Sequence, residues 1–506
     1  MSVNRQDYSD ELVEGGFAIE VADAPLLHEG LNLADLAHVL VLQEGGIAPA
    51  PAVARLLGVL LDAQATPVGE FGYDPAYGET YNWRERRFTE GIGDDAGWLH
   101  AGRTRREAVR VALRIRLRRD VVDLIEAAAR FVEAAAELAG KHAETYMADQ
   151  TYLQHAQPST FGHYLLQFAY SGLRDVDRLV TDLAWINRSP GGVGCVNGSS
   201  LPYDRARIAE LLGFDDVIEH TRDAMWQADG LLTLVADAAG LVTTLAKLAE
   251  DLEIWSSKEF DYVELAHGHT RGSVMMPQKR NPYALSMVRG EAGVLIGRLT
   301  GLYAVAKTPS ARSDNLIFAY GEVPRSTELA TKATRLMAGV VGGLRVNAAA
   351  MYRALETGYS QSTDLAEFVM LAAEVDYRTA YDVVGVTVRR AAREGVAGIA
   401  ITGEMLDAAA TEVRGHPLGL TGRDLTAVLD PASIVRTRAT RGGAAPEVVR
   451  GMADDCLAAA RGALAAAQAR RAAFAQAEEK LLVAAADRAG AEWAGGDWHR
   501  RAVVEG

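Results

Sequence analysis

Apolar residues recur every three or four positions through long stretches of this chain that contain almost no glycine or proline. Residues 104–149 show this pattern most clearly, with apolar residues at Val109, Leu113, Ile115, Leu117, Val121, Leu124 and Ile125. The spacing is that of one face of a helix. Segments at about 158–187, 223–256 and 282–306 follow it too. Helices of this length are typical of a bundle, and strand-like alternation is scarce, so the sequence predicts an all-α fold.

We expect the 506 residues to form four segments, separated by short glycine- and proline-rich stretches and by changes in composition. Residues 1–112 are predicted to form an N-terminal helical domain, and residues 113–362 the central bundle of long helices. A change in composition near 345–362 predicts a small C-terminal helical domain over residues 363–455. The alanine-rich segment that follows predicts a helical tail and extension over residues 456–506.

Composition and charge narrow the class of protein. The chain is 49% hydrophobic and 24% charged, which is typical of a globular protein, and its net charge of -15 argues against a nucleic-acid or anionic-membrane partner. Cys195 and Cys456 are far apart and in no metal-ligand spacing, so both are expected to be reduced. The polar N-terminus lacks a secretory pattern, and we expect no stretch of the chain to cross a bilayer. We therefore expect a cytoplasmic protein.

The loop at residues 270–282 carries the clearest candidate chemistry. Ser273 follows a glycine, Lys279 and Asn281 lie a few residues on, and Pro282 is suited to begin a helix. Free backbone N–H groups at a helix N-terminus and a neighbouring lysine would both attract a carboxylate. The same positive field would favour an ionised serine. By itself, this pattern also fits an ordinary glycine-containing loop.

Three blocks of this sequence resemble the fumarase/aspartase superfamily, and argininosuccinate lyase in particular. Residues 272–282, GSVMMPQKRNP, are similar to its GSSxMPxKxNP signature, residues 99–106, LHAGRTRR, to its LHTGRSRN block, and residues 151–163, TYLQHAQPSTFGH, to its THLQxAQPxTFGH block. The similarity extends over residues 30–450. It implies a three-domain helical subunit in a homotetramer, with each active site shared by three subunits, and anti elimination that forms fumarate without a metal or organic cofactor.

The resemblance also implies a role for each matching residue. Ser273 would be the base that removes a proton next to a substrate carboxylate, and Lys279 would stabilise the charge that develops there. Thr151 and Tyr152 would complete the catalytic group. The substrate-binding residues would be Thr104, Arg105, Arg106, Gln157, Met275, Asn281 and Arg312. The substrate would be a small dicarboxylate.

The sequence departs from the family pattern where the leaving group is expected. Tyr152 replaces a histidine often assigned to leaving-group protonation, and Ser286 replaces the glutamate that pairs with it. Tyr152 is a candidate general acid, and His155 is a weaker one that would share its face on a helix. Arg106 replaces a neutral amide, so it either turns to solvent or binds a further substrate group.

Three functions remain open from the sequence. A carbon–nitrogen lyase acting on an N-substituted aspartate, resembling ethylenediamine-disuccinate (EDDS) lyase, accounts best for the altered blocks. Argininosuccinate lyase proper is the first alternative. A non-catalytic scaffold of the crystallin kind is the second, although the retention of Ser273, Lys279, Asn281 and Arg105 argues against it.

Overall fold

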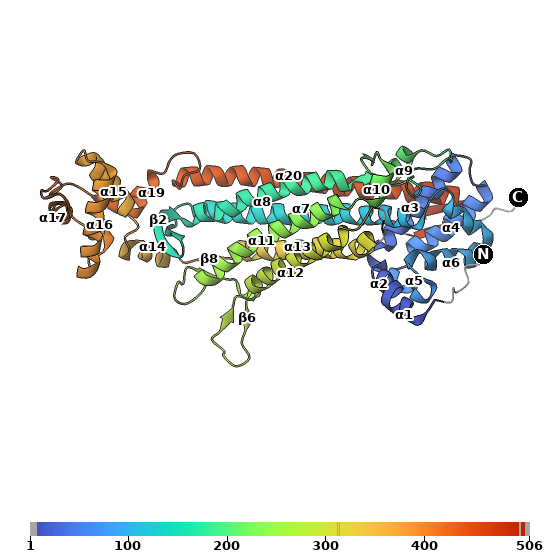
Figure 1. Ribbon diagram of the computed structural model, residues 1–506, viewed down its shortest axis with the longest axis horizontal. Coiled ribbons are helices and arrows are strands. Elements are labelled where there is room, and N and C mark those ends of the chain that lie inside the picture. The colour runs from blue at the N-terminus through green and yellow to red at the C-terminus, as the bar shows by residue number, and fades with distance from the viewer. Residues whose placement is uncertain (1–7, 311, 313, 495–496, 501–506) are drawn as a thin grey trace.

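A computed structural model describes residues 8–310, 312, 314–494 and 497–500. The molecule is elongated, with N-terminal helices at one end, a small helical domain at the other, and long helices running between them (Figure 1). Its regular structure is dominated by helices, and its strands form only two-stranded pairs. The all-α prediction is confirmed.

The N-terminal end is a cluster of mostly short helices packed around the buried helix α3. Its elements are α1 (Asp10–Leu12), the π-helical turn η1 (Val13–Phe17), α2 (Ala18–Ala22), α3 (Ala24–Glu44), α4 (Ala50–Ala65), α5 (Val68–Phe71), η2 (Pro75–Tyr77), α6 (Thr80–Ile92) and η3 (Gly93–His100). Their core is continuous with that of the bundle.

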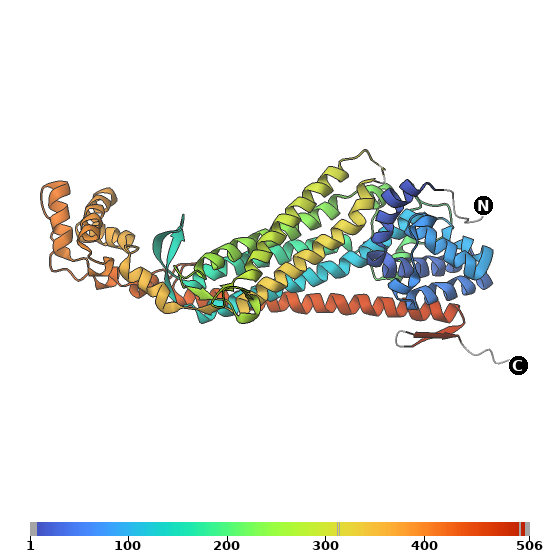
Figure 2. The same ribbon diagram turned by 90° about the horizontal axis from the view of Figure 1, so that it is seen from below.

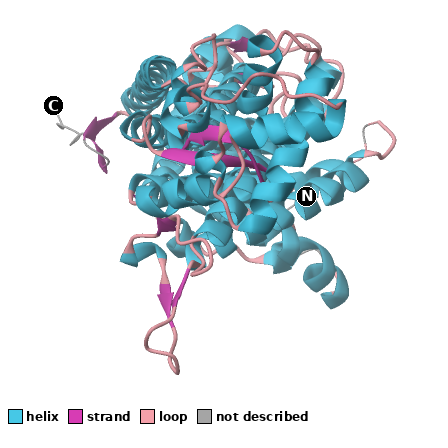
Figure 3. Ribbon diagram, turned by 90° about the vertical axis from the view of Figure 1, so that its left-hand side faces the viewer, coloured by secondary structure: helices cyan, strands magenta, loops and turns pink. Residues whose placement is uncertain are grey.

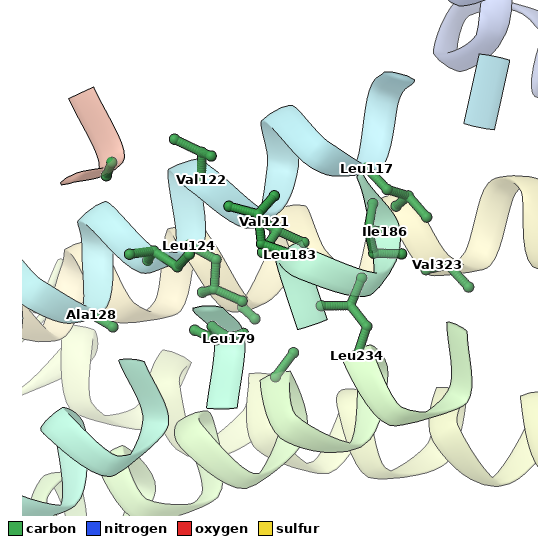
Figure 4. Packing of buried hydrophobic residues seen from close by; sticks show 14 of the residues in the cluster. Leu117, Val121, Val122, Leu124, Ala128, Leu179, Leu183, Ile186, Leu234 and Val323 are labelled. Atoms are coloured by element: carbon green, nitrogen blue, oxygen red, sulfur yellow. The ribbon is translucent and has the colours of Figure 1, made fainter. Parts of the chain in front are cut away.

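Helix α7 (Arg105–Lys141) is the central helix of the bundle and packs against α8, α13, α20 and α3. The expected apolar face is buried: in Figure 4, Leu117 lies near Ile186 of α8, and Val121 and Leu124 lie near Leu183 and Leu179 of the same helix. The other bundle helices and the short elements that join them are α8 (Phe161–Ile186), α9 (Arg205–Leu212), α10 (Thr221–Trp226), α11 (Asp229–Trp255), η4 (His267–His269), α12 (Tyr283–Ala306), α13 (Asp314–Gly342) and α14 (Ala348–Thr357).

The short strands close turns and connections around the bundle. Antiparallel pairs join β1 (Tyr146–Thr151) to β2 (Gln154–Thr160), β5 (Val263–Glu264) to β8 (Arg345–Val346), β6 (Arg271–Gly272) to β7 (Arg280–Asn281), and β9 (Ala491–Ala494) to β10 (Asp497–Arg500), while β3 (Arg188–Ser189) pairs in parallel with β4 (Asp216–Val217). Two of these hairpins, β1–β2 and β6–β7, carry candidate site residues.

Helix α20 (Pro446–Arg488) returns the chain along the whole bundle (Figure 2). Cys456, Leu464, Phe474 and Leu481 are buried in the main core, against α7 and its neighbours. The boundary expected at 455/456 thus falls inside this helix, and the segment expected to be a tail is a bundle helix followed by the β9–β10 hairpin. Likewise, the boundary expected at 112/113 falls inside α7.

The small domain has a core of its own. It is built from α15 (Ser362–Ala372), α16 (Tyr377–Glu394), η5 (Gly398–Ala400), α17 (Gly403–Arg414), α18 (Thr426–Leu429) and α19 (Pro431–Arg436). Its buried residues, from Leu365 to Leu429, form a cluster separate from the main core. The predicted start of this domain, residue 363, lies in the first turn of α15.

Helix α11 is long and apolar enough, by length and composition alone, to cross a membrane. The sequence predicts no such segment. An 18-residue window in it has a mean hydropathy of 1.6, and half of that window is buried inside the chain. Because α11 packs against α8, α12 and α13, its composition fits a core helix of the bundle.

Candidate active site

The first block, residues 99–106, is fixed in place by buried charge. Arg103 donates from Nη2 to Asp35 Oδ1 at 2.5 Å and to the Tyr81 hydroxyl at 2.6 Å, and Arg84 pairs with the other oxygen of Asp35 at 2.7 Å. Although burial alone would raise it, Arg103 and Arg84 hold the pKa of Asp35 below its usual range. Thr104 then caps α7 by accepting from the Glu107 N–H at 3.4 Å.

Arg105 and Arg106 begin α7, and both have acidic partners within the chain. Arg106 Nη1 lies 2.8 Å from Glu20 Oε2 and 3.1 Å from Glu79 Oε2, so this side chain does not turn freely to solvent. Arg105 donates to the amide oxygen of Asn82, and its Nη1 lies 3.6 Å from Glu79 Oε1. The Arg105 side chain is 43% exposed, which leaves it within reach of a ligand.

The acidic residues around Arg106 belong to a partly dehydrated pocket. Burial raises the pKa of Glu79; Arg106 opposes this rise, and the neighbouring Glu20 carboxylate adds to it. Tyr320, on α13, lines the same small cavity and is 3% exposed, with no hydrogen-bond partner for its hydroxyl. The sequence pattern gave no sign of Glu20 or Glu79, since neither lies in a recognised block.

The second block forms the β1–β2 hairpin, which stands off the bundle (turquoise in Figure 2). Tyr152 and Leu153 make its two-residue turn with positive φ angles of 55° and 58°, and the Tyr152 side chain is 98% exposed. Thr151 and Gln157 are exposed on the two strands. Because His155 pairs with Gln150 across the hairpin, the expectation that it shares a helical face with Tyr152 is wrong.

The third block forms the β6–β7 hairpin, whose tip projects from the helices (Figure 3). At the start of its loop, directly after β6, Ser273 Oγ accepts hydrogen bonds from the N–H groups of Met275 at 3.3 Å and Met276 at 3.1 Å. Hydrogen bonds to the charged form of a group favour that form, so these two donors would stabilise an ionised serine. The Asn281 amide donates to the Arg271 carbonyl at 3.0 Å and closes the hairpin.

The remaining residues of this block are open to solvent. Met275 is 83% exposed, and the Lys279 side chain is exposed with it. Ser286 is exposed on the first turns of α12, and Arg312 is exposed between α12 and α13. No group of three His, Cys, Asp or Glu residues in the described part of the chain is arranged to hold a metal ion.

One chain does not bring the three blocks together. The first block begins α7 and the β1–β2 hairpin follows its end, so the 37 residues of α7 separate them by about 55 Å. Arg110 contacts the carbonyls of Met225 and Gln227 just before α11, and the β6–β7 hairpin follows the end of that 27-residue helix, about 40 Å away. A site that uses all three blocks therefore needs more than one copy of the chain.

Comparison with known proteins identifies the family. Residues 68–297 match a family described as lyase, and residues 359–436 match the argininosuccinate lyase C-terminal family. The argininosuccinate lyase of Natronomonas pharaonis is 36% identical over 449 residues, which cover 88% of each chain. The chain belongs to the fumarase/aspartase superfamily.

Further relatives place this lyase near the argininosuccinate lyase branch. The argininosuccinate lyase of Methanosarcina acetivorans is 32% identical over 82% of this chain and 83% of its own. A solved structure of an EDDS lyase variant with bound fumarate is 27% identical and covers 97% of both chains with a TM-score of 0.84. The protein is thus a carbon–nitrogen lyase of the argininosuccinate lyase type.

Proposed function

We propose that this lyase performs anti elimination on an N-substituted aspartate, breaking a carbon–nitrogen bond to give fumarate and an amine or other nitrogen compound, or catalyses the reverse addition. The observation that carries the proposal is its likeness, over nearly the whole chain, to an EDDS lyase variant that holds fumarate. We also propose that it acts in the cytoplasm.

Ser273 is the proposed base. Its hydroxyl oxygen accepts hydrogen bonds from two backbone N–H groups, and these bonds favour the alkoxide. Lys279 follows on the same hairpin. The alkoxide takes the proton from the carbon next to a carboxylate, while Lys279 and Asn281 stabilise the charge that grows on that carboxylate. Arg105, with its planar guanidinium, binds the other end of the succinyl unit.

Tyr152 is the proposed general acid for the departing nitrogen, with Thr151 beside it. Its exposure at a hairpin tip in a single chain supports a role in a neighbouring copy's site. Gln157, Met275, Thr104 and Arg312 are proposed substrate contacts. The Thr104 hydroxyl already makes hydrogen bonds within the chain, since it also donates to the Gly194 carbonyl at 3.3 Å.

A homotetramer built through the long helices would bring the blocks together. Helix α12 supports this proposal because apolar side chains on its outer side, among them Val294 and Ile296, are about half exposed in the single chain. Gly290, Gly293, Gly297 and Gly301 lie along the same helix, and a Cβ atom at any of them would meet nothing within 4 Å. Small residues allow helices to approach closely, so α12 is suited to packing against other copies.

Argininosuccinate lyase proper is the second candidate, because the curated relatives at 31–36% identity carry that name. The Tyr152 and Ser286 substitutions favour a different leaving group. The test is to offer the purified protein argininosuccinate and a panel of N-substituted aspartates and to follow fumarate absorbance. We expect the highest kcat/KM with a substrate other than argininosuccinate. Preference for argininosuccinate would overturn that choice, and no fumarate from any substrate would favour a non-catalytic scaffold.

A further inference from the structure

A glycine-rich loop, residues 191–198, lies against the start of α7 and is tied to it by two side chains. The Thr104 hydroxyl donates to the Gly194 carbonyl at 3.3 Å. Glu107 Oε1 accepts from the Gly192 N–H at 2.6 Å. Gly192 and Gly194 have positive φ angles of 74° and 64°, a conformation that favours glycine. The path of the loop thus suits a close approach to the first block.

Glu107 departs from the usual arrangement at the start of a helix. Thr104 and Glu107 have the spacing of a capping box, in which the glutamate reaches back to the backbone N–H of the capping residue. Here the Glu107 carboxylate bonds the Gly192 N–H of the loop instead. Glu107 is only 1% exposed, and its Oε2 atom has no hydrogen-bond partner among the described residues. Burying a carboxylate in this way costs free energy, and what the side chain holds in return is the loop.

The other side of the loop is bound to α10. Trp226 Nε1 donates to the Cys195 carbonyl at 3.2 Å, and the Thr221 hydroxyl donates to the Val196 carbonyl at 3.0 Å. Without the Glu107 carboxylate, the loop would therefore keep its hydrogen bonds to α10 while it lost one of its two ties to α7.

The second of these ties competes with substrate binding. A threonine hydroxyl has a single proton to donate, and in this structure Gly194 accepts it. Because a carboxylate offers only acceptors, Thr104 can donate to a substrate carboxylate only by giving up its bond to Gly194. Of the two ties, only the hydrogen bond between Glu107 and Gly192 then joins the loop to α7.

We propose that Glu107 is a positioning residue for substrate binding, which holds the loop against the first block through Gly192 while Thr104 turns to the substrate carboxylate. This inference rests on the proposed function. Because Glu107 is buried, it would act through Gly192 and Thr104 rather than by touching the substrate. Groups that are held in place before the substrate arrives lose less conformational entropy on binding, so the effect should appear in affinity.

The test measures the Kd of the purified, assembled protein for fumarate by isothermal titration calorimetry. Glu107→Ala should raise this Kd by about tenfold, because the Gly192 N–H loses its acceptor. Glu107→Gln keeps an oxygen with the same reach, so its Kd should stay within about threefold of the wild-type value. If the buried charge were what mattered, both variants would show the same loss.

Asp182→Ala is the matched control for truncating a buried carboxylate. Asp182 is 6% exposed and also has an oxygen without a partner among the described residues, but it lies on α8 and faces Asp237. This variant should bind fumarate with the wild-type Kd. Circular dichroism and size-exclusion chromatography show whether each variant is folded and assembled.

A second pair of variants disturbs the loop and leaves Glu107 intact. In Gly194→Ala the new Cβ would lie 2.7 Å from the Gly198 carbonyl oxygen, at a φ that disfavours alanine, so the Kd should again rise by about tenfold. Gly46→Ala is the control, because Gly46 has a φ of 65° but a Cβ atom there would meet nothing within 4 Å. It should leave the Kd unchanged.

Wild-type affinity in folded Glu107→Ala or Gly194→Ala, or no recovery in folded Glu107→Gln, would overturn this inference. The proposed function would still stand, because fumarate formation from the substrate panel tests it separately. Absence of fumarate binding by the wild type would also overturn the inference, and together with no fumarate from the panel it would remove both.

Discussion

Arg105 and Ser273 belong to sequence blocks that are equally easy to recognise, yet the structure supports them in different ways. Arg105 begins a bundle helix whose start is tied by Arg103 to the buried Asp35. Ser273 lies on a two-stranded hairpin whose tip is surrounded by solvent in the single chain. The proposed binding end of the site is therefore preorganised within each chain, whereas the proposed catalytic hydroxyl lies on a projection that a neighbouring copy would have to cover.

The largest expected effect comes from removing that hydroxyl. Ser273→Ala should lower turnover by about a thousandfold or more, because residues 271–281 contain no other hydroxyl, imidazole or carboxylate to take the proton. Steady-state assay of fumarate formation measures it, with size-exclusion chromatography to confirm assembly. Val274→Ala, at the adjacent exposed residue, is the control and should stay within a few fold. Near-normal activity of Ser273→Ala would rule out Ser273 as the base.

A mixing experiment tests directly whether the two regions come from different copies. Arg105→Ala and Ser273→Ala should each be nearly inactive alone. Equal amounts of the two variants are unfolded and refolded together. If the two blocks of a site come from different copies, about a quarter of the sites should contain both an intact Arg105 and an intact Ser273. Activity should then return to about a quarter of the wild-type value. Refolding either variant by itself is the control. No recovery from the mixture would mean that one chain supplies both blocks.

The stability of the preorganised region should also depend on pH. Glu107, on α7, is buried and accepts the Gly192 N–H at 2.6 Å, and burial raises its pKa to about 7 from an ordinary 4.5. Because the folded chain binds this proton more tightly than the unfolded chain, stability falls as the pH rises from 4.5 through 7. Between pH 5 and pH 8 the loss is about 2 kcal/mol.

Glu107→Gln removes this titration. The difference in the free energy of unfolding, variant minus wild type, should therefore rise by about 2 kcal/mol between pH 5 and pH 8. Urea denaturation at one fixed protein concentration measures the difference. Parallel pH curves for the two proteins would show that Glu107 keeps an ordinary pKa in the folded chain.

Much of the preorganised region could be predicted from sequence, and little of the projecting one. Apolar periodicity identified α7 because Leu117, Val121 and Leu124 stand out among charged neighbours. The hairpin turn at Tyr152 and Leu153 contains no glycine or asparagine, so nothing local signalled a turn. The sequence predicts a tail where α20 lies because several of its buried positions, such as Ala460 and Ala467, are alanines among other alanines. Glu20 and Glu79 could not be found from a motif, since only the fold brings them to Arg106.

The smallest expected effect concerns that unusual turn. A non-glycine residue at positive φ raises the free energy of the folded chain by about 1 kcal/mol. Leu153 is about half exposed, so its packing offsets little of this strain. Leu153→Gly should therefore stabilise the β1–β2 hairpin by up to about 1 kcal/mol, whereas Leu371→Gly, an exposed leucine in helix α15, should destabilise its domain by a similar amount. Thermal unfolding compares the signs. If Leu153→Gly instead lowers stability only in the assembled protein, then Leu153 packs against another copy, and the projecting region depends on assembly for its conformation as well as for its chemistry.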